Sequence, residues 1–305
     1  MKAYFLWLAK FITIILVTAI FIPVIVVVIA SAVVGFGEMQ KSPGQSSKRS
    51  VAVIELNGVI ENSKEIVDEL YKQAQNPGVE GIVLRIDSPG GSVGPSQDIY
   101  QAVKELKAKK PIVASMASVA ASGGLYSALS ASKILAQPGT LTGSIGVIMQ
   151  LPNLTKIAEK AGFEMITIKT GALKDTGNSF RPMSESDRQF LEETALKVYA
   201  DFVTAVSDSR SIPRETVLTF ADGRVIIGSE AKQIGLIDDL GGVYDAARAV
   251  FDIKGSPLPE GEVPRLVYKS DPFEEVRRAI NGVTKTISSF DLRGGSAKVL
   301  YQMIY

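Results

Sequence analysis

Short apolar runs alternate with amphipathic stretches along the chain beyond residue 50. The runs 51–56 and 81–87 are mostly apolar, which is typical of strands buried on both faces. Apolar residues at helical spacing predict helices over 64–75 and 95–107. The remaining predictions are strands over 111–116, 134–137 and 164–169 and a small-residue helix over 122–132. Repeated strand–helix units of this kind indicate an α/β domain with helices on both faces of its sheet.

The longest predicted helix covers residues 184–210. Ser184 and Asp187 have the spacing of a capping box, in which each side chain bonds the backbone of the other residue. Apolar residues recur along one face of this helix, at Leu191, Ala195, Val198, Phe202 and Val206. This pattern predicts an amphipathic helix with one apolar face.

Residues 11–34 contain no charged side chain. A helix of this length would reach about 36 Å, more than the ~30 Å of a bilayer's hydrocarbon core. The alternative is a cleaved signal peptide, since Ala30, Ser31 and Ala32 resemble a cleavage site. Cleavable apolar cores usually have only about 7–15 residues, which favours a transmembrane anchor. Lysines and arginines flank the segment on both sides, so charge does not decide its orientation.

The sequence thus predicts a single-pass membrane protein. Residues 1–10 form a short flank, residues 11–34 the anchor, and the small polar residues 35–50 a flexible tether. Residues 51–250 form the α/β domain. Residues 251–305 are either part of that domain or a tail used in docking or assembly.

Composition narrows the chemistry. The chain has 33 Lys+Arg against 32 Asp+Glu, a net charge of +1, which gives no general attraction to nucleic acid. It has no Cys and no His, which excludes disulfides, thiolate nucleophiles, imidazole bases and the metal sites that these side chains build. Any enzyme built from this chain must move protons with Asp, Glu, Lys, Tyr or a hydroxyl group.

Two glycine-rich turns follow predicted strands. Residues 87–92 (DSPGGS) can expose backbone N–H groups to an oxyanion or phosphate, although the motif taken alone favours a tight turn. Ser122 stands at the start of a predicted helix between small residues, where its Oγ can be approached closely. The N–H of Gly123 would face any oxyanion formed when this serine attacks a carbonyl. The alternative is that Ser122 only caps its helix.

A serine nucleophile in this chain needs a base other than histidine. A lysine can serve when burial disfavours its charged form. Lys174 lies in a loop after the predicted strand 164–169, where composition alone indicates an ordinary surface lysine. Ser144, in the motif Thr142–Gly143–Ser144, could orient such an amine or could stand in a simple turn.

Five segments in order resemble the short form of the bacterial signal peptide peptidase A family. They are IDSPGGSV (86–93), SMASVAASGGLY (115–126), LTGSIGVIMQ (141–150), IKTGALKD (168–175) and DGRVIIGSEAKQIGLIDDLGG (222–242). The resemblance covers roughly residues 50–250. It implies a fold like that of Clp protease and the crotonases.

The resemblance also implies roles for individual residues. Ser122 would be the nucleophile, Lys174 the general base and Ser144 a residue that orients the lysine, while Gly91 and Gly123 would form the oxyanion hole. The adjacent carboxylate of Asp175 would hold a facing amine in its charged form, so we expect it to point away from Lys174.

The implied activity is a membrane-anchored endopeptidase with a Ser-Lys dyad that degrades remnant signal peptides and other unfolded apolar peptides. It needs no cofactor and no metal, and the family forms ring-like or dome-like homo-oligomers. The implied location is the bacterial inner membrane, with the anchor 11–34 in the lipid and the catalytic domain outside the cytoplasm. The alternatives are a non-catalytic membrane scaffold or an acyl-CoA-type enzyme with a crotonase-like fold.

Overall fold

A computed structural model describes residue 10 and residues 49–269 of the chain. The predicted anchor 11–34, most of the tether and residues 270–305 lie outside these described residues. Within the described part, none of the helices has the length and apolar character needed to cross a bilayer.

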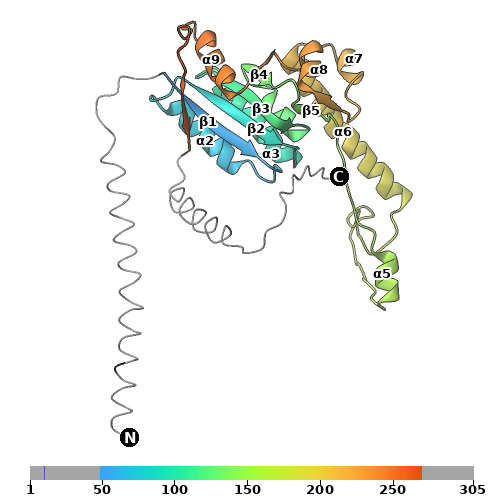
Figure 1. The fold of residues 1–305 in the computed structure, drawn as a ribbon. Coiled ribbons are helices and arrows are strands. Elements are labelled where there is room, and N and C mark those ends of the chain that lie inside the picture. Colours follow the sequence, from blue (N-terminus) through green and yellow to red (C-terminus); the bar gives the residue numbers. More distant parts are fainter. Residues whose placement is uncertain (1–9, 11–48, 270–305) are drawn as a thin grey trace, which may run out of the picture. The chain divides into compact units, whose positions relative to one another are not determined.

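A mixed sheet of eight strands forms the centre of the domain (Figure 1). Its main path is β6-β5-β3-β2-β1-β8, and β4 pairs with β3 and β7. Only the β5–β6 pair is antiparallel. The strands are β1 (Ser50–Asn57), β2 (Gly81–Ser88), β3 (Ile112–Ala120), β4 (Lys133–Ala136), β5 (Leu141–Gly143), β6 (Val225–Ile227), β7 (Asp239–Leu240) and β8 (Arg265–Tyr268).

Helices cover both faces of the parallel strands, as the sequence predicts. The helices are α2 (Lys64–Gln75), α3 (Val93–Leu106), α4 (Gly123–Ala128), α5 (Thr155–Lys160), α6 (Glu185–Arg210), α7 (Arg214–Leu218), α8 (Gly228–Gln233) and α9 (Val243–Ile253). Alternate side chains of β1 divide between two cores: Val51 and Val53 pack with α9, while Ala52 and Ile54 pack with α2, α3 and α4. Such strands are buried on both faces, which explains why their sequences are almost continuously apolar.

The two ends of the described domain meet at the edge of the sheet. β8 pairs in parallel with β1, so part of the predicted 251–305 extension is in the sheet. Arg49, placed in the tether by the sequence, donates hydrogen bonds to the carbonyl oxygens of Ser256 (2.6 Å) and Pro257 (3.0 Å). The ordered domain therefore includes Arg49.

Helix α6 begins with the predicted capping box and has two different halves. Asp187 N donates to Ser184 Oγ (3.1 Å), and Ser184 N donates to Asp187 Oδ2 (3.0 Å). In the second half Phe202 and Val206 are buried in the core below the helix. The first half is largely exposed. It directly follows another exposed segment of the chain.

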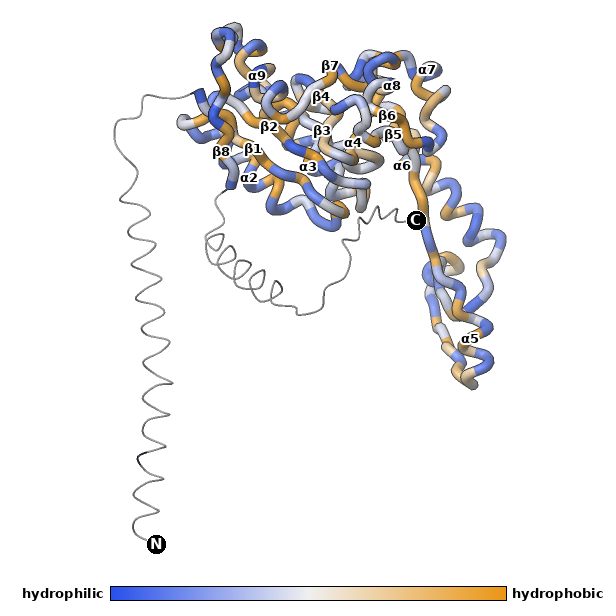
Figure 2. Tube along the Cα trace, in the orientation of Figure 1, coloured by the Kyte–Doolittle hydropathy of each residue, from blue (hydrophilic) through white to orange (hydrophobic). Residues whose placement is uncertain are grey.

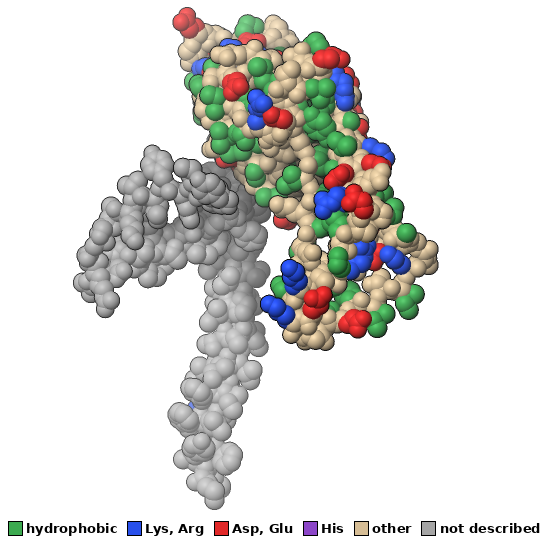
Figure 3. All heavy atoms as spheres, turned by 90° about the vertical axis from the view of Figure 1, so that its right-hand side faces the viewer, with side chains coloured by type: hydrophobic (Ala, Val, Ile, Leu, Met, Phe, Trp, Pro, Cys, Tyr) green, Lys and Arg blue, Asp and Glu red, His purple; other side chains and the backbone are tan. Residues whose placement is uncertain are grey.

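That segment, residues 148–183, is called the arm here and contains α5 (Figure 1). Apolar and polar residues are mixed along it (Figure 2), and Figure 3 shows apolar and charged side chains together on its surface. Few of its residues are buried. Its exposed large apolar residues are Ile148, Met149, Leu151, Ile157, Phe163, Met165, Ile166, Ile168, Leu173 and Met183. The strand predicted over 164–169 is wrong, because this stretch pairs with no strand of the described chain. An alternating pattern produces a strand only where a partner supplies the hydrogen bonds.

Candidate active site

Three loops meet at the carboxyl ends of neighbouring strands. They follow β2, β3 and β5, which pair in the order β5-β3-β2. The carboxyl ends of parallel strands are where α/β sheets hold their ligands. The loops contain Gly91, Ser122, Gly123 and Ser144, and these four residues line one pocket.

Ser122 has a backbone conformation that is rare for a residue with a side chain. Its φ is 51° and its ψ −120°, and its N–H donates to the carbonyl oxygen of Gly143 at 2.9 Å. Its side chain makes no capping hydrogen bond with α4, so the alternative of a simple helix cap is wrong. Strained residues at a sharp strand-to-helix turn are typical of serine nucleophiles, because the turn exposes the hydroxyl group.

Gly91 and Gly123 bring two backbone amides close together beside this serine. A Cβ atom on Gly123 would lie 3.2 Å from the amide nitrogen of Gly91 and 2.4 Å from Ser96 Oγ. One on Gly91 would lie 2.3 Å from the carbonyl oxygen of Ile60. Neither amide donates a hydrogen bond to another described residue. Two unpaired N–H groups next to a serine hydroxyl have the composition of an oxyanion hole.

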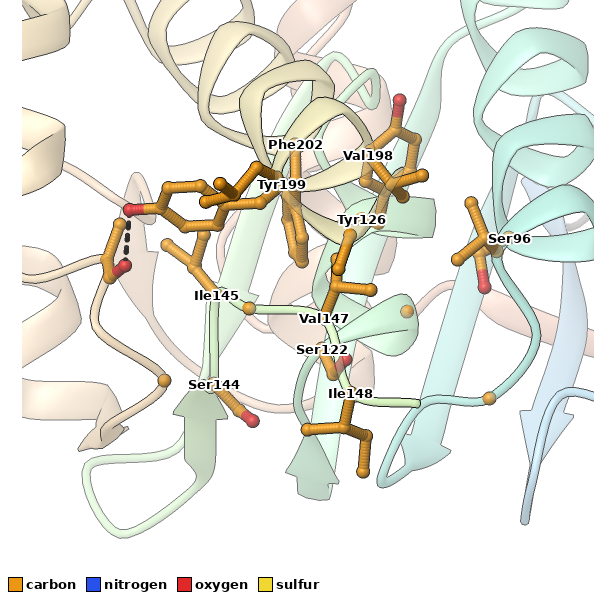
Figure 4. A pocket seen from close by; sticks show the side chains of 18 of the residues that line it. Ser96, Ser122, Tyr126, Ser144, Ile145, Val147, Ile148, Val198, Tyr199 and Phe202 are labelled. Atoms are coloured by element: carbon orange, nitrogen blue, oxygen red, sulfur yellow. Dashed lines mark hydrogen bonds between the residues drawn. The ribbon is translucent and has the colours of Figure 1, made fainter. Parts of the chain in front are cut away.

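Ser144 has a positive φ of 50° and donates its N–H to the carbonyl oxygen of Arg224 at 2.7 Å. The neighbouring Thr142 hydroxyl is buried and donates to the carbonyl oxygen of Ala120 at 2.7 Å. Thr142 therefore fixes the turn, while Ser144 presents its hydroxyl group to the pocket. In Figure 4 the side chains of Ser122 and Ser144 lie on the same side of this pocket.

The pocket has a volume of about 960 Å³ and is largely apolar. One wall comes from the middle of α6, which includes Val198 and Phe202, and the other from the loop after β5, which contains Ile145 and Val147 (Figure 4). Tyr126 and Phe202 close it with an edge-to-face contact at 5.0 Å between ring centres. The geometry suits an apolar side chain held next to a serine hydroxyl.

Lys174 is the predicted site residue that this structure does not bring to the pocket. It lies exposed in a turn of the arm, where its N–H donates to the carbonyl oxygen of Gly171 at 3.1 Å. Asp175 behaves as predicted, because its carboxylate faces Arg181 and Lys169 instead of the Lys174 amine. The hydrogen bonds from Arg181 and then Lys169 hold the pKa of Asp175 well below its usual range.

The structure adds pocket residues that the sequence analysis did not single out as part of a site. Phe202 and Val198 were assigned only to a packing face, and Tyr126 was noted only within a family motif, because a helical stripe does not show whether it meets a core or a cavity. Asp222 also lines the pocket, and its bonds with Arg224 lower its pKa to about 2, so it stays ionised near neutrality. In the described part of the chain, no group of three or more Asp or Glu residues is placed to hold a metal ion.

The matches with known proteins include a peptidase family and several proteins with protease names. The model of Peptidase family S49 matches residues 104–254. A Synechocystis protein provisionally named a protease is 35% identical over 78% of this chain and 85% of its own length. A protein of Enterococcus faecium, provisionally named signal peptide peptidase SppA, is 32% identical over 74% of this chain and 69% of its own length. Protease 4 of Salmonella typhi is 33% identical over 67% of this chain but only 34% of its own length.

The α/β fold and these matches together define a peptidase. The chain belongs to Peptidase family S49, and its resemblance to the signal peptide peptidase A family is confirmed.

Proposed function

We propose that this peptidase is a membrane-anchored serine endopeptidase whose Ser-Lys dyad is shared between two copies of the chain. Ser122 acts from its own pocket, and Lys174 enters that pocket from the arm of a neighbouring copy. The observation that supports this arrangement is that the pocket contains Ser122, both oxyanion-hole amides and Ser144, whereas Lys174 of the same chain lies outside it.

The exposed surface of the arm supports a second copy as the source of the lysine. Ile166 is 82% exposed and Ile168 97% exposed, a few residues before Lys174. Apolar residues gathered on one extended segment lose contact with water when another protein surface covers them. A head-to-tail contact, repeated around a closed ring, would cover every arm and complete every pocket.

The proposed chemistry needs only these residues. The neutral amine of Lys174 takes the hydroxyl proton as Ser122 Oγ bonds to the peptide carbonyl carbon, and the N–H groups of Gly91 and Gly123 stabilise the oxyanion. The lysine ammonium gives the proton to the leaving amine. A water molecule then attacks the acyl-enzyme, passes a proton to the lysine, and the proton returns to Ser122. Ser144 orients the amine.

The pocket's apolar walls favour unfolded, apolar peptides, and remnant signal peptides at a membrane are the proposed substrates. Enclosure of the sites in an oligomer would exclude folded proteins. The anchor 11–34 would hold the enzyme in the inner membrane with its catalytic domain outside the cytoplasm. A non-catalytic scaffold or an acyl-CoA-type enzyme is less well supported, since the chain belongs to a peptidase family.

The experiment that tests this proposal is labelling of the detergent-solubilised full chain with a fluorophosphonate. Wild type should be labelled, and the Ser122→Ala, Lys174→Ala and Lys174→Arg variants should not be, because arginine keeps its charge and cannot accept a proton. If the Lys174→Arg variant were labelled as fast as wild type, Lys174 would not be the general base.

Mixed oligomers test whether the dyad is shared. When Ser122→Ala and Lys174→Ala chains are co-expressed, some pockets receive an intact serine from one copy and an intact lysine from another. Random assembly should then restore about a quarter of the wild-type activity. If the dyad formed within one chain, co-expression would restore no activity, because every chain lacks either Ser122 or Lys174.

A further inference from the structure

A cluster of ion pairs at the base of the arm, where the arm joins α6, surrounds Asp175, the residue after Lys174. Lys169 Nζ lies 2.6 Å from Asp175 Oδ1, and Arg181 Nε lies 2.8 Å from Asp175 Oδ2. Arg181 Nη2 also donates to Asp175 Oδ1 at 3.0 Å. Both oxygens of the Asp175 carboxylate are therefore occupied by cationic side chains other than that of Lys174.

The same guanidinium group ties this turn to helix α6. Arg181 Nη1 donates to Asp187 Oδ2, and the side chain of Asp187 is only 2% exposed. Asp187 Oδ1 accepts from Thr176 Oγ1 at 2.9 Å, and the same residue completes the capping box with Ser184. Arg181 thus connects the turn that contains Lys174 to a fixed point at the start of the helix.

The position of the Asp175 carboxylate matters if Lys174 is a general base. A carboxylate next to an amine favours the ammonium form, which cannot accept a proton from serine. Asp175 follows Lys174 directly in the chain, so its carboxylate can reach that amine if nothing else holds it. In the pocket that the lysine would enter, the lining carboxylates are those of Glu192 and Asp222. The charged groups facing Asp175 in the described structure are Lys169 from the preceding segment and Arg181 from the following one.

We propose that Arg181 is a positioning residue for catalysis, which holds the Asp175 carboxylate away from Lys174 so that the lysine amine can lose its proton. This inference rests on the proposed function of Lys174 as general base. Arg181 touches neither the serine nor the peptide. It acts through Asp175, while Lys169 supplies the second contact.

Neither carboxylate of the cluster gains a proton in the pH range of the test described below. The pKa of Asp175 is lowered first by Arg181, and the pKa of Asp187 is lowered by the same guanidinium. Both carboxylates stay ionised from pH 6 to 10. A change in activity over that interval therefore does not come from protonation of these two carboxylates.

The test is the pH profile of fluorophosphonate acylation, measured on the full chain in detergent from pH 6 to 10. Arg181→Gln should move the midpoint upward by about one pH unit or more, because a released carboxylate stabilises the nearby ammonium. The maximal rate at high pH should remain. Arg181→Lys, which keeps a cation at this position, should stay closer to wild type.

The decisive comparison is the double variant. Arg181→Gln with Asp175→Asn removes both the guanidinium group and the carboxylate that it binds. The midpoint of the pH profile should therefore return to the wild-type value or lie below it. A purely structural role for Arg181 would not be rescued by this second substitution, and a failure of rescue would overturn the proposal. Asp175→Asn alone should leave the midpoint close to that of wild type. A downward shift of more than about one unit would mean that Asp175 already pairs with Lys174, which also overturns the proposal.

The outcome can be separated from failure of the proposed function. If Lys174→Arg is labelled like wild type, the dyad itself is wrong. If Lys174→Arg is unlabelled and Arg181→Gln keeps the wild-type midpoint, the dyad stands and only the role of Arg181 fails.

Discussion

Two regions of the described domain are stabilised in different ways. They are the body, residues 49–147 and 184–269, and the arm, residues 148–183. In the body, strands such as β2 are buried between helices on both faces, and large side chains such as Phe251 are completely enclosed. In the arm, Ile166 and Ile168 are exposed, and order at its base comes from ion pairs around Arg181.

This difference in burial indicates which part of the proposed site is complete within one chain. The body shapes the serine, the paired amides and the pocket, because these features need rigid packing. The arm presents the lysine on a segment whose apolar surface one copy does not cover. We therefore expect variants of the body to affect the serine and its oxyanion hole directly, and variants of the arm's exposed apolar residues to act through assembly.

The largest expected effect is in the body. Ser122→Ala should lower peptidase activity by about 10³-fold or more, since it removes the nucleophile. Its fold should persist, because the side chain makes no capping hydrogen bond. Peptide turnover and circular dichroism of purified protein measure the two effects. Residual turnover of even a few per cent of the wild-type rate would show that another group attacks the peptide.

The next effect concerns the paired amides. Gly123→Ala should lower acylation by about 10²-fold, because the new Cβ displaces one N–H of the oxyanion hole. Gly94→Ala is the matched control, since a Cβ on Gly94 would meet no heavy atom within 4 Å. Acylation rates of the two variants should differ widely. Gly123→Ala should also melt at a lower temperature, because its Cβ would lie 2.4 Å from Ser96 Oγ. Equal rates would argue against the Gly123 amide as a donor.

A smaller effect is expected from the arm surface. Ile166→Asp with Ile168→Asp should break the oligomer and lower activity about tenfold or more, because charges do not enter an apolar contact. The melting temperature of the body should change little. Val59→Asp, at a residue that is 62% exposed on the body, is the control. Sedimentation measures assembly, and an intact, active oligomer of the double variant would contradict the shared dyad.

The smallest effect is the acid sensitivity of the arm's base. The pKa of Asp187 is lowered, first by Arg181, so its ion pair contributes full stability above the ordinary carboxyl value of about 3.9 and loses it as the pH falls through the folded value. The difference in melting temperature between wild type and Asp187→Asn should be constant from pH 6 to 8 and shrink below about pH 4. A difference that changed between pH 6 and 8 would point to another titrating group.

Much of the fold could be predicted from the sequence. The helix Lys64–Gln75 has the bounds that its pattern indicates, and the capping box of Ser184 and Asp187 forms as their spacing predicts. Such features depend on residues a few positions apart, whose contacts are nearly the same in any fold. The segment 164–169 was predicted wrongly because a strand also requires a distant partner.

The sequence by itself determined the α/β class, the family motifs and the absence of a histidine base, because these depend only on residue types and their order. Only the tertiary structure decided that Ser122 has a strained backbone, that its side chain does not cap α4, and that the amides of Gly91 and Gly123 converge beside it. It also decided that Lys174 lies outside the pocket of its own chain. These facts depend on the pairing order of β2, β3 and β5, which local spacing does not contain.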